Sequence, residues 1–167
     1  MKRLPVIAFA ALVLGTVAAF FLIQHLKVTT PLIAGNPSPF PPVINPLTGG
    51  ACAVRTADGH RKTVSVRRTS VSFYLLNRSD EVDVYVVNQT GAIVDALRTG
   101  LFMRAAPHPV PATFTWNGRE QNGRVAPPGM YYLKVVLQHQ GRTIDITNSK
   151  GLLEWVTVNL SARCPRA

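Results

Sequence analysis

The 167-residue chain is poor in acidic residues and in charge overall. Only 8 Asp and Glu residues stand against 18 Lys and Arg, which gives a formal net charge of +10. Charged residues make up 16% of the chain, where about a quarter is usual for a soluble domain. A strongly cationic partner surface is therefore excluded. The length allows about one domain, which excludes a multidomain enzyme, and the apolar fraction of 47% argues against a disordered chain.

Sequence motifs for catalysis, cofactors and metals are also missing. The four histidines form no ligand pair at strand or helix spacing, and no Ser-His-Asp order or Gly-rich phosphate loop stands out. We predict no catalytic, cofactor-binding or metal-binding residue, no cofactor and no enzyme activity. A hydrolase acting on cell-wall polymer is the weaker alternative, since no acid/base pair can be named. For Asp80, Glu81 and Asp83 a solvated face is favoured over a calcium site, because calcium takes about six or more oxygens.

The N-terminus holds a long uncharged run. Residues 4–23 carry no charge and follow Lys2 and Arg3. At about 1.5 Å per residue the run reaches about 30 Å, the thickness of the hydrocarbon core of a bilayer. We predict a cytoplasmic stub at residues 1–3 and a transmembrane signal-anchor helix at residues 4–26, in contact with the lipid bilayer. The positive-inside rule then gives a single-pass plasma-membrane protein whose later residues are extracytoplasmic.

A cleavable secretory signal is the alternative interpretation of this run. Val17-Ala18-Ala19 is acceptable as a cleavage site, but a cut there would leave residues 20–23 as an exposed apolar N-terminus. The uncleaved anchor is favoured because the run exceeds the apolar core of about 7–15 residues that a signal peptide needs.

The two cysteines, Cys52 and Cys164, lie near the two ends of the predicted domain and have no Cys-x-x-Cys or Cys/His spacing. In an oxidising compartment we expect one disulfide that fastens the first strand to the last. Such a long loop would stabilise the fold by about 4–5 kcal/mol in the chain-entropy model. Two independent buried thiols are the alternative.

Residues 27–50 are rich in proline and glycine, with six prolines between Thr29 and Gly50. Proline removes amide donors and favours the extended polyproline II conformation, so a helix or a central strand is excluded here. We predict an extracytoplasmic stalk over residues 27–50, in preference to a docking ligand, and a folded domain over residues 51–167.

From residue 51 onward, apolar and polar residues alternate. The alternation is clearest over residues 70–75, 82–87 and 131–138, and a β-branched run covers residues 152–160. Alternation of this kind is typical of half-buried antiparallel strands, and glycine-containing turn signals separate the runs. We predict an all-β, antiparallel β-sandwich of about 7–9 strands after the single N-terminal transmembrane helix.

The most specific pattern lies between Thr113 and Val135. A strand ends in a large aromatic residue, a connection with glycines at positions of expected positive φ follows, and a second strand opens with tyrosine. This order resembles the Ig-like domain of the flagellar hook-capping protein family. The matching positions are Trp116, Asn117, Gly118, Gly123, Pro127, Gly129 and Tyr131.

The resemblance covers about Ser70 to Leu137, and Glu120 departs from it where the family carries Asp or Asn. It implies an Ig-like fold and extracytoplasmic scaffolding, and none of the matched positions is catalytic in the family. We interpret Trp116 and Tyr131 as structural, because a Trp ahead of a tight turn usually plugs the end of a sandwich.

The densest basic patch is formed by Arg61, Lys62, Arg67 and Arg68. Contact with anionic lipid or cell-wall polymer is its functional interpretation, and ordinary solubility is the alternative. Nucleic acid is not predicted as a partner, because the domain lacks a recognition element and is expected outside the cytoplasm.

Together these features predict a membrane-anchored, extracytoplasmic binding or scaffolding module of the cell envelope. Its expected partner is a protein or an anionic envelope polymer, met through an exposed edge strand or an aromatic patch. The alternative function is an accessory subunit of an export or surface-appendage assembly machine. No oligomeric state is predicted.

Overall fold

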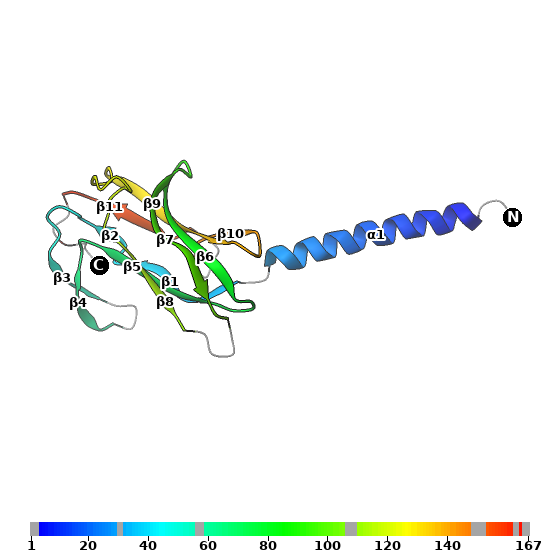
Figure 1. Ribbon diagram of the computed structural model, residues 1–167, viewed down its shortest axis with the longest axis horizontal. Helices are drawn as coiled ribbons and strands as arrows, with labels where there is room; N and C mark the ends of the chain where they lie inside the picture. Colours follow the sequence, from blue (N-terminus) through cyan, green and yellow to red (C-terminus); the bar gives the residue numbers. More distant parts are fainter. Residues whose placement is uncertain are drawn as a thin grey trace. The chain divides into compact units, whose positions relative to one another are not determined.

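The computed structural model describes residues 4–29, 32–55, 59–105, 110–147, 153–161 and 164. The chain divides into two compact units, residues 1–32 and residues 33–167. The first unit contains the helix α1 (Leu4–Thr29), and the second is a β-domain (Figure 1).

Helix α1 has 26 residues, and its described side chains, at Phe9 and at residues 11–23, are all exposed. Among the residues that the structure describes, no helix is both long and apolar enough to cross a membrane. The predicted single-pass plasma-membrane localisation, with the domain outside, is wrong on this finding, and the predicted anchor at residues 4–26 is not supported.

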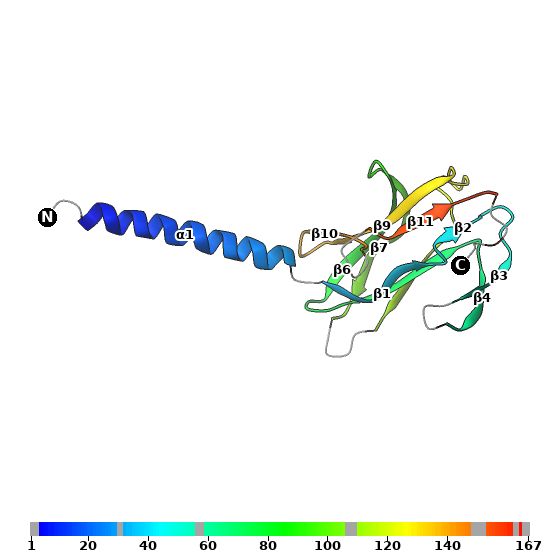
Figure 2. The same cartoon turned by 180° about the vertical axis from the view of Figure 1, so that it is seen from behind.

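The described part of the β-domain contains two sheets and a separate hairpin (Figures 1 and 2). One sheet has the order β1-β5-β8, and the other has the order β2-β11-β9-β6-β7, with β10 also paired to β9. Strands β3 and β4 form the hairpin. The strands are β1 (Ile33–Phe40), β2 (Val43–Ile44), β3 (Ala51–Arg55), β4 (Arg61–Ser65), β5 (Thr69–Leu75), β6 (Asp80–Asn88), β7 (Ile93–Met103), β8 (Ala112–Trp116), β9 (Gly129–Leu137), β10 (Arg142–Asp145) and β11 (Trp155–Val158).

The core follows the alternation seen in the sequence. In β5, Val71, Phe73 and Leu75 are buried while the residues between them are half-buried. Leu133 and Val135 of β9 are buried in the same way. The mostly β architecture is consistent with an Ig-like sandwich. It has eleven described strands, and β2 pairs with β11 in parallel, whereas an antiparallel sandwich of about 7–9 strands was expected.

The additional strands come partly from the proline-rich segment predicted as a stalk. Strand β1 pairs antiparallel with β5, and β2 pairs with β11, so residues 33–50 belong to the domain. Proline excludes a central strand but is tolerated at an edge. Strand β1 lies at the edge of its sheet, and its register shifts between Asn36 and Phe40, where Pro37 and Pro39 fall.

Buried Asn45 fastens this segment to the rest of the domain. Its side-chain oxygen accepts hydrogen bonds from the backbone N–H groups of Leu47 and Thr48, at 3.1 and 3.0 Å. Its amide nitrogen donates to the carbonyl oxygen of Leu160 at 2.9 Å. The turn after β2 is thereby joined to the C-terminal part of the chain.

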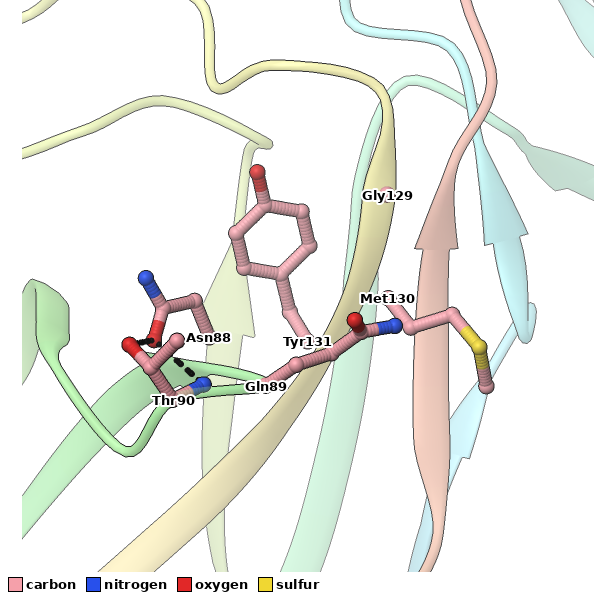
Figure 3. A pocket seen from close by; sticks show the side chains of 6 residues that line it. All are labelled: Asn88, Gln89, Thr90, Gly129, Met130 and Tyr131. Atoms are coloured by element: carbon pink, nitrogen blue, oxygen red, sulfur yellow. Dashed lines mark hydrogen bonds between the residues drawn. The ribbon is translucent and has the colours of Figure 1, made fainter.

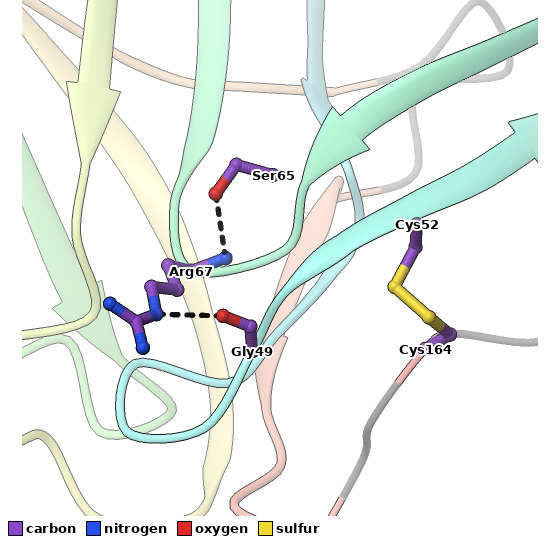
Figure 4. Close-up of a disulfide and its surroundings, with 5 residues drawn as sticks. All are labelled: Gly49, Cys52, Ser65, Arg67 and Cys164. Atoms are coloured by element: carbon purple, nitrogen blue, oxygen red, sulfur yellow. Dashed lines mark hydrogen bonds between the residues drawn. A yellow bond between two sulfur atoms is a disulfide. The ribbon is translucent and has the colours of Figure 1, made fainter.

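The predicted disulfide between Cys52 and Cys164 is confirmed, and the two Cα atoms lie 5.6 Å apart (Figure 4). Cys52 lies on β3 rather than on the first strand. It packs in a small buried cluster with Val66, against Phe40 and Val64. The bond therefore ties the β3–β4 hairpin to the C-terminal end of the chain.

We predict that loss of this disulfide destabilises the domain. The bond joins cysteines 112 positions apart and so encloses strands β4 to β11. Cys164→Ser should therefore lower the free energy of unfolding by about 2–5 kcal/mol. Denaturant unfolding, with and without reductant, measures the loss. In the control, reductant should leave the Cys52→Ser/Cys164→Ser double variant unchanged. An unchanged midpoint for reduced native protein would contradict the prediction.

Candidate functional site

An apolar groove lies between β7 and β8, which are edge strands of different sheets. Its two sections, of about 390 and 290 Å³, share Leu101 and Ala112 and are therefore continuous. At one end the chain crosses between the sheets, where Ala105 bridges to Leu75 of β5. At the other end the N–H of Gln121 donates to the carbonyl oxygen of Val94, at 2.9 Å. The groove thus lies along the open side of the sandwich, where β7 and β8 are the last strands of their sheets.

Apolar and basic side chains line this groove. Phe102 is 59% exposed and Val110 is 77% exposed, although both are large hydrophobic residues. Arg98 and Arg104 are also exposed, and within the described residues neither side chain makes a hydrogen bond or an ion pair. Exposed apolar side chains beside unpaired cations are typical of a surface for a partner.

The groove residues were not among the site residues predicted from the sequence. The segment from Ile93 to Met103 reads as a weak strand because Asp95, Arg98 and Gly100 interrupt its apolar positions. A large aromatic residue, Phe102, two positions before Arg104 was the available signal. Sequence alone could not pair this segment with β8, because the two strands belong to different sheets.

A second pocket, of about 220 Å³, lies between the β6–β7 turn and the start of β9 (Figure 3). The Asn88 and Thr90 side chains that line this pocket form hydrogen bonds within the turn. The side-chain oxygen of Asn88 accepts hydrogen bonds from the N–H and hydroxyl of Thr90, at 3.0 and 2.7 Å, and from the N–H of Ala92 at 3.0 Å. The pocket is therefore the weaker candidate for a ligand.

The basic residues predicted to contact an anionic surface, Arg61, Lys62, Arg67 and Arg68, are all exposed. They differ in what they do. Arg67 donates from Nε to the carbonyl oxygen of Gly49 at 2.7 Å and so holds the turn before β3 (Figure 4). Arg61 and Lys62 are successive residues of β4 and therefore point to opposite faces of the hairpin.

The residues of the tryptophan motif meet at one end of the sandwich. Trp116 is 1% exposed, and its Nε1 donates to the carbonyl oxygen of Arg119 at 2.8 Å. Its ring centroid lies 5.0 Å from that of Tyr131, whose hydroxyl donates to the carbonyl oxygen of Pro127 at 2.7 Å. Burial, with a smaller effect from the charge of Glu120, raises the pKa of the Tyr131 hydroxyl. Trp116 and Tyr131 thus have structural roles.

Two asparagines order the connection after Trp116. The side-chain oxygen of Asn117 accepts from the N–H of Arg119 at 3.1 Å, and that of Asn122 accepts from the N–H of Arg124 at 2.8 Å. Glu120 occupies the position where the resemblance favours Asp or Asn, and it accepts a hydrogen bond from Asn122 at 3.0 Å. The departure at Glu120 therefore leaves the connection ordered.

The motif glycines have different roles. Gly118 has φ of +73°, and a Cβ atom there would collide with the ring of Pro46 and lie 3.1 Å from Ile44. Gly123 has φ of +81°, but a Cβ atom would meet open space. Gly129 has no positive φ, contrary to the expectation, and begins β9. Gly118 is thus required both for its backbone conformation and for close packing against β2.

Comparison with known protein families identifies this part of the chain. The family model of the FlgD Ig-like domain matches residues 61–141, just under half of the chain. Residues 61–141 are thus similar to an FlgD Ig-like domain. The match confirms the resemblance inferred from the tryptophan motif, and this FlgD-like segment also contains the whole groove.

Other comparisons add little to this assignment. No curated protein matches the chain. Among solved structures, a crystal structure of FlgD from P. aeruginosa is similar over 61% of this chain and 67% of that chain, with 20% identity and a TM-score of 0.36. A score at this level does not add to the fold assignment.

In the acidic cluster at the start of β6, Glu81 is exposed, as expected of a solvated face, whereas Asp80 and Asp83 are buried. Asp80 is 1% exposed, and its carboxylate accepts from the N–H groups of His139 and Gln140 and lies 2.9 Å from Nδ1 of His139. Asp83 is also buried and accepts from the N–H of Gly100 at 2.7 Å. Both carboxylates thus satisfy groups of neighbouring turns and bulges, which the alternation pattern could not reveal.

The described residues contain no group of three or more His, Cys, Asp or Glu side chains that could hold a metal ion. The side chains of His25 and His108 lie outside the described residues.

We predict that Gly118→Ala destabilises the domain more than Gly123→Ala does. Both changes strain a positive φ, at a cost of about 1 kcal/mol, but only Gly118→Ala also forces a collision with Pro46. Its total cost should be about 2–4 kcal/mol. Denaturant midpoints of the two variants measure the difference, and equal losses would show that the contact with β2 contributes nothing.

We predict that Asp80 makes the domain sensitive to acid. Burial works to raise the pKa of Asp80, but the hydrogen bonds from His139 and Gln140 outweigh it and hold the pKa below the ordinary value of 3.8. A lowered pKa in the folded state contributes stability above pH 3.8 that is lost as the pH falls through the folded pKa.

Asp80→Asn should therefore lower the free energy of unfolding at pH 7 by about 1–3 kcal/mol and flatten its decline below pH 4. Unfolding curves at a series of pH values measure both effects. The exposed residue Asp145 supplies the control, Asp145→Asn. An unaltered acid profile in Asp80→Asn would refute the assigned role.

Proposed function

We propose that this chain is a non-catalytic binding or scaffolding module that engages a protein partner through the groove between β7 and β8. The observation that carries the proposal is the combination of exposed Phe102 and Val110 with unpaired Arg98 and Arg104 in one groove. Exposed apolar side chains that lie together in one patch mark an interaction surface, whereas isolated ones do not. The β-sandwich would hold the contact surface in a fixed geometry.

The chemistry of the buried carboxylates supports a non-catalytic role. A general acid or base must reach a substrate, but the oxygens of Asp80 and Asp83 accept hydrogen bonds from neighbouring groups of the fold. Asp83 also accepts from the side chain of Gln138, at 2.6 Å. The oxygens of these carboxylates are occupied by hydrogen bonds within the fold.

The family match supports a second candidate function. A subunit of an export or surface-appendage assembly machine would use an FlgD Ig-like domain as its scaffold. An anionic polymer is the alternative partner class, supported by Arg61, Lys62 and Arg68, whose exposed side chains make no described ion pair.

We predict that a photo-crosslinking residue at position 102 captures a defined protein in cells that produce the full chain. Ile93 is the matched control, because it lies on the same strand and is 57% exposed, against 59% for Phe102, but does not line the groove. Mass spectrometry should identify one adduct at position 102 that is missing at position 93.

The identity of the adduct separates the two functions. A subunit of an appendage or export machine would support the second candidate, and another protein would support a separate binding module. Absence of an adduct at position 102, or the same adducts at both positions, would contradict a partner in the groove.

A further inference from the structure

On the basis of the proposed function, we infer that the groove binds an extended acidic segment of the partner, which adds to β8 as a further strand. The inference specifies the chemistry and conformation of the partner. It follows from two independent features, the open backbone edge of β8 and the unpaired cations beside it.

Strand β8 has the most regular open edge of the described sheets. Its five residues pair with β5 without a register shift and include no proline, glycine or charged residue. The outer edge of β1 is interrupted by prolines, and β7 shifts register at three places. The other edge strands of the two larger sheets, β2 and β10, have two and four residues. Strands β3 and β4 of the hairpin are as long as β8 but contain the charged residues Arg55, Arg61 and Lys62. An unpaired regular edge is a template for an added strand, whereas bulges and prolines block such pairing.

The charges beside this edge select an acidic partner. Arg67 and Arg119 donate to the carbonyl oxygens of Gly49 and Gly123, so they are used within the fold. Arg98 and Arg104 have no such contacts in the described structure. Carboxylates of a partner would complement them, whereas a second copy of this chain would bring a further net charge of +10.

The groove also limits the length and pattern of the segment. It follows β8 from Ala112 to Thr115, which corresponds to about four extended residues at about 3.3 Å each. Side chains of an added strand alternate between two faces. A segment that alternates apolar and acidic residues would therefore present the two kinds of side chain on opposite faces.

Fluorescent peptides test this inference against the full chain. The first probe alternates Val and Asp over ten positions, and the second alternates Val and Lys in the same way. The third probe has the Val-Asp sequence with Pro placed at every third position. Fluorescence anisotropy should show binding of the first probe that weakens as salt is added. The second probe should not bind, and the third should bind at least about tenfold more weakly, because proline cannot continue a ladder.

Variants locate the site. Arg98→Ser/Arg104→Ser should weaken binding of the Val-Asp probe by about tenfold. Arg78→Ser/Arg124→Ser removes the same charge from exposed positions outside the groove and should leave binding unchanged. Amide hydrogen exchange of Ala112–Trp116 should slow when the probe is bound.

The outcomes are distinguishable. Equal binding of the three probes, equal losses in the two double variants, or unaltered exchange in β8 would each overturn the inference. If position 102 still forms its specific adduct in cells while the probes fail, the proposed function stands and only the acidic, extended partner is rejected. If the adduct is missing as well, the proposed function fails.

Discussion

The course of β7 depends on one buried carboxylate. Residues 98 to 101 of β7 face a shorter stretch of β6, because Val84 pairs with Arg98 and Val82 pairs with Leu101. This bulge leaves the N–H of Gly100 outside the regular ladder, and Asp83 accepts its hydrogen bond. Loss of this bond would leave an oxygen of the buried Asp83 carboxylate without its partner, at a cost of about 1–3 kcal/mol. The carboxylate therefore stabilises the bulge, and the bulge contains or adjoins Arg98, Leu101 and Phe102 of the groove.

A second constraint joins the ends of the domain. Asn45 binds the carbonyl oxygen of Leu160, Cys52 is bonded to Cys164, and β2 pairs with β11. These contacts are distant in sequence and lie largely outside the FlgD-like segment. The residues before and after that segment form strands that flank it. The close packing of Gly118 against Ile44 and Pro46 connects the segment to its N-terminal flank. The segment and its flanks therefore form one packed domain.

In the FlgD-like segment, the residues of the tryptophan motif and the residues of the groove serve different purposes. Trp116, Asn117 and Tyr131 use their polar and aromatic groups in contacts within the fold, and Gly118 packs against Ile44 and Pro46. Their pattern identifies the family because turn geometry and packing restrict which residues fit. Four residues of the groove, Arg98, Phe102, Arg104 and Val110, meet no such restriction from the fold, since their side chains are exposed. This freedom makes them suited to a partner, and it also explains why a motif does not reveal them.

The sequence by itself determined the β class of the domain, the core positions of β5 and β9, the family motif and the cysteine pair. These features depend on local periodicity, on turn chemistry or on a small choice of partners. Only the tertiary structure decided that the proline-rich segment supplies β1 and β2, that Asp80 and Asp83 are buried, and that β7 and β8 border one groove. It also removed the basis for the expected membrane localisation. Strand pairing and burial join residues far apart in the chain, and local patterns carry no information about such pairs.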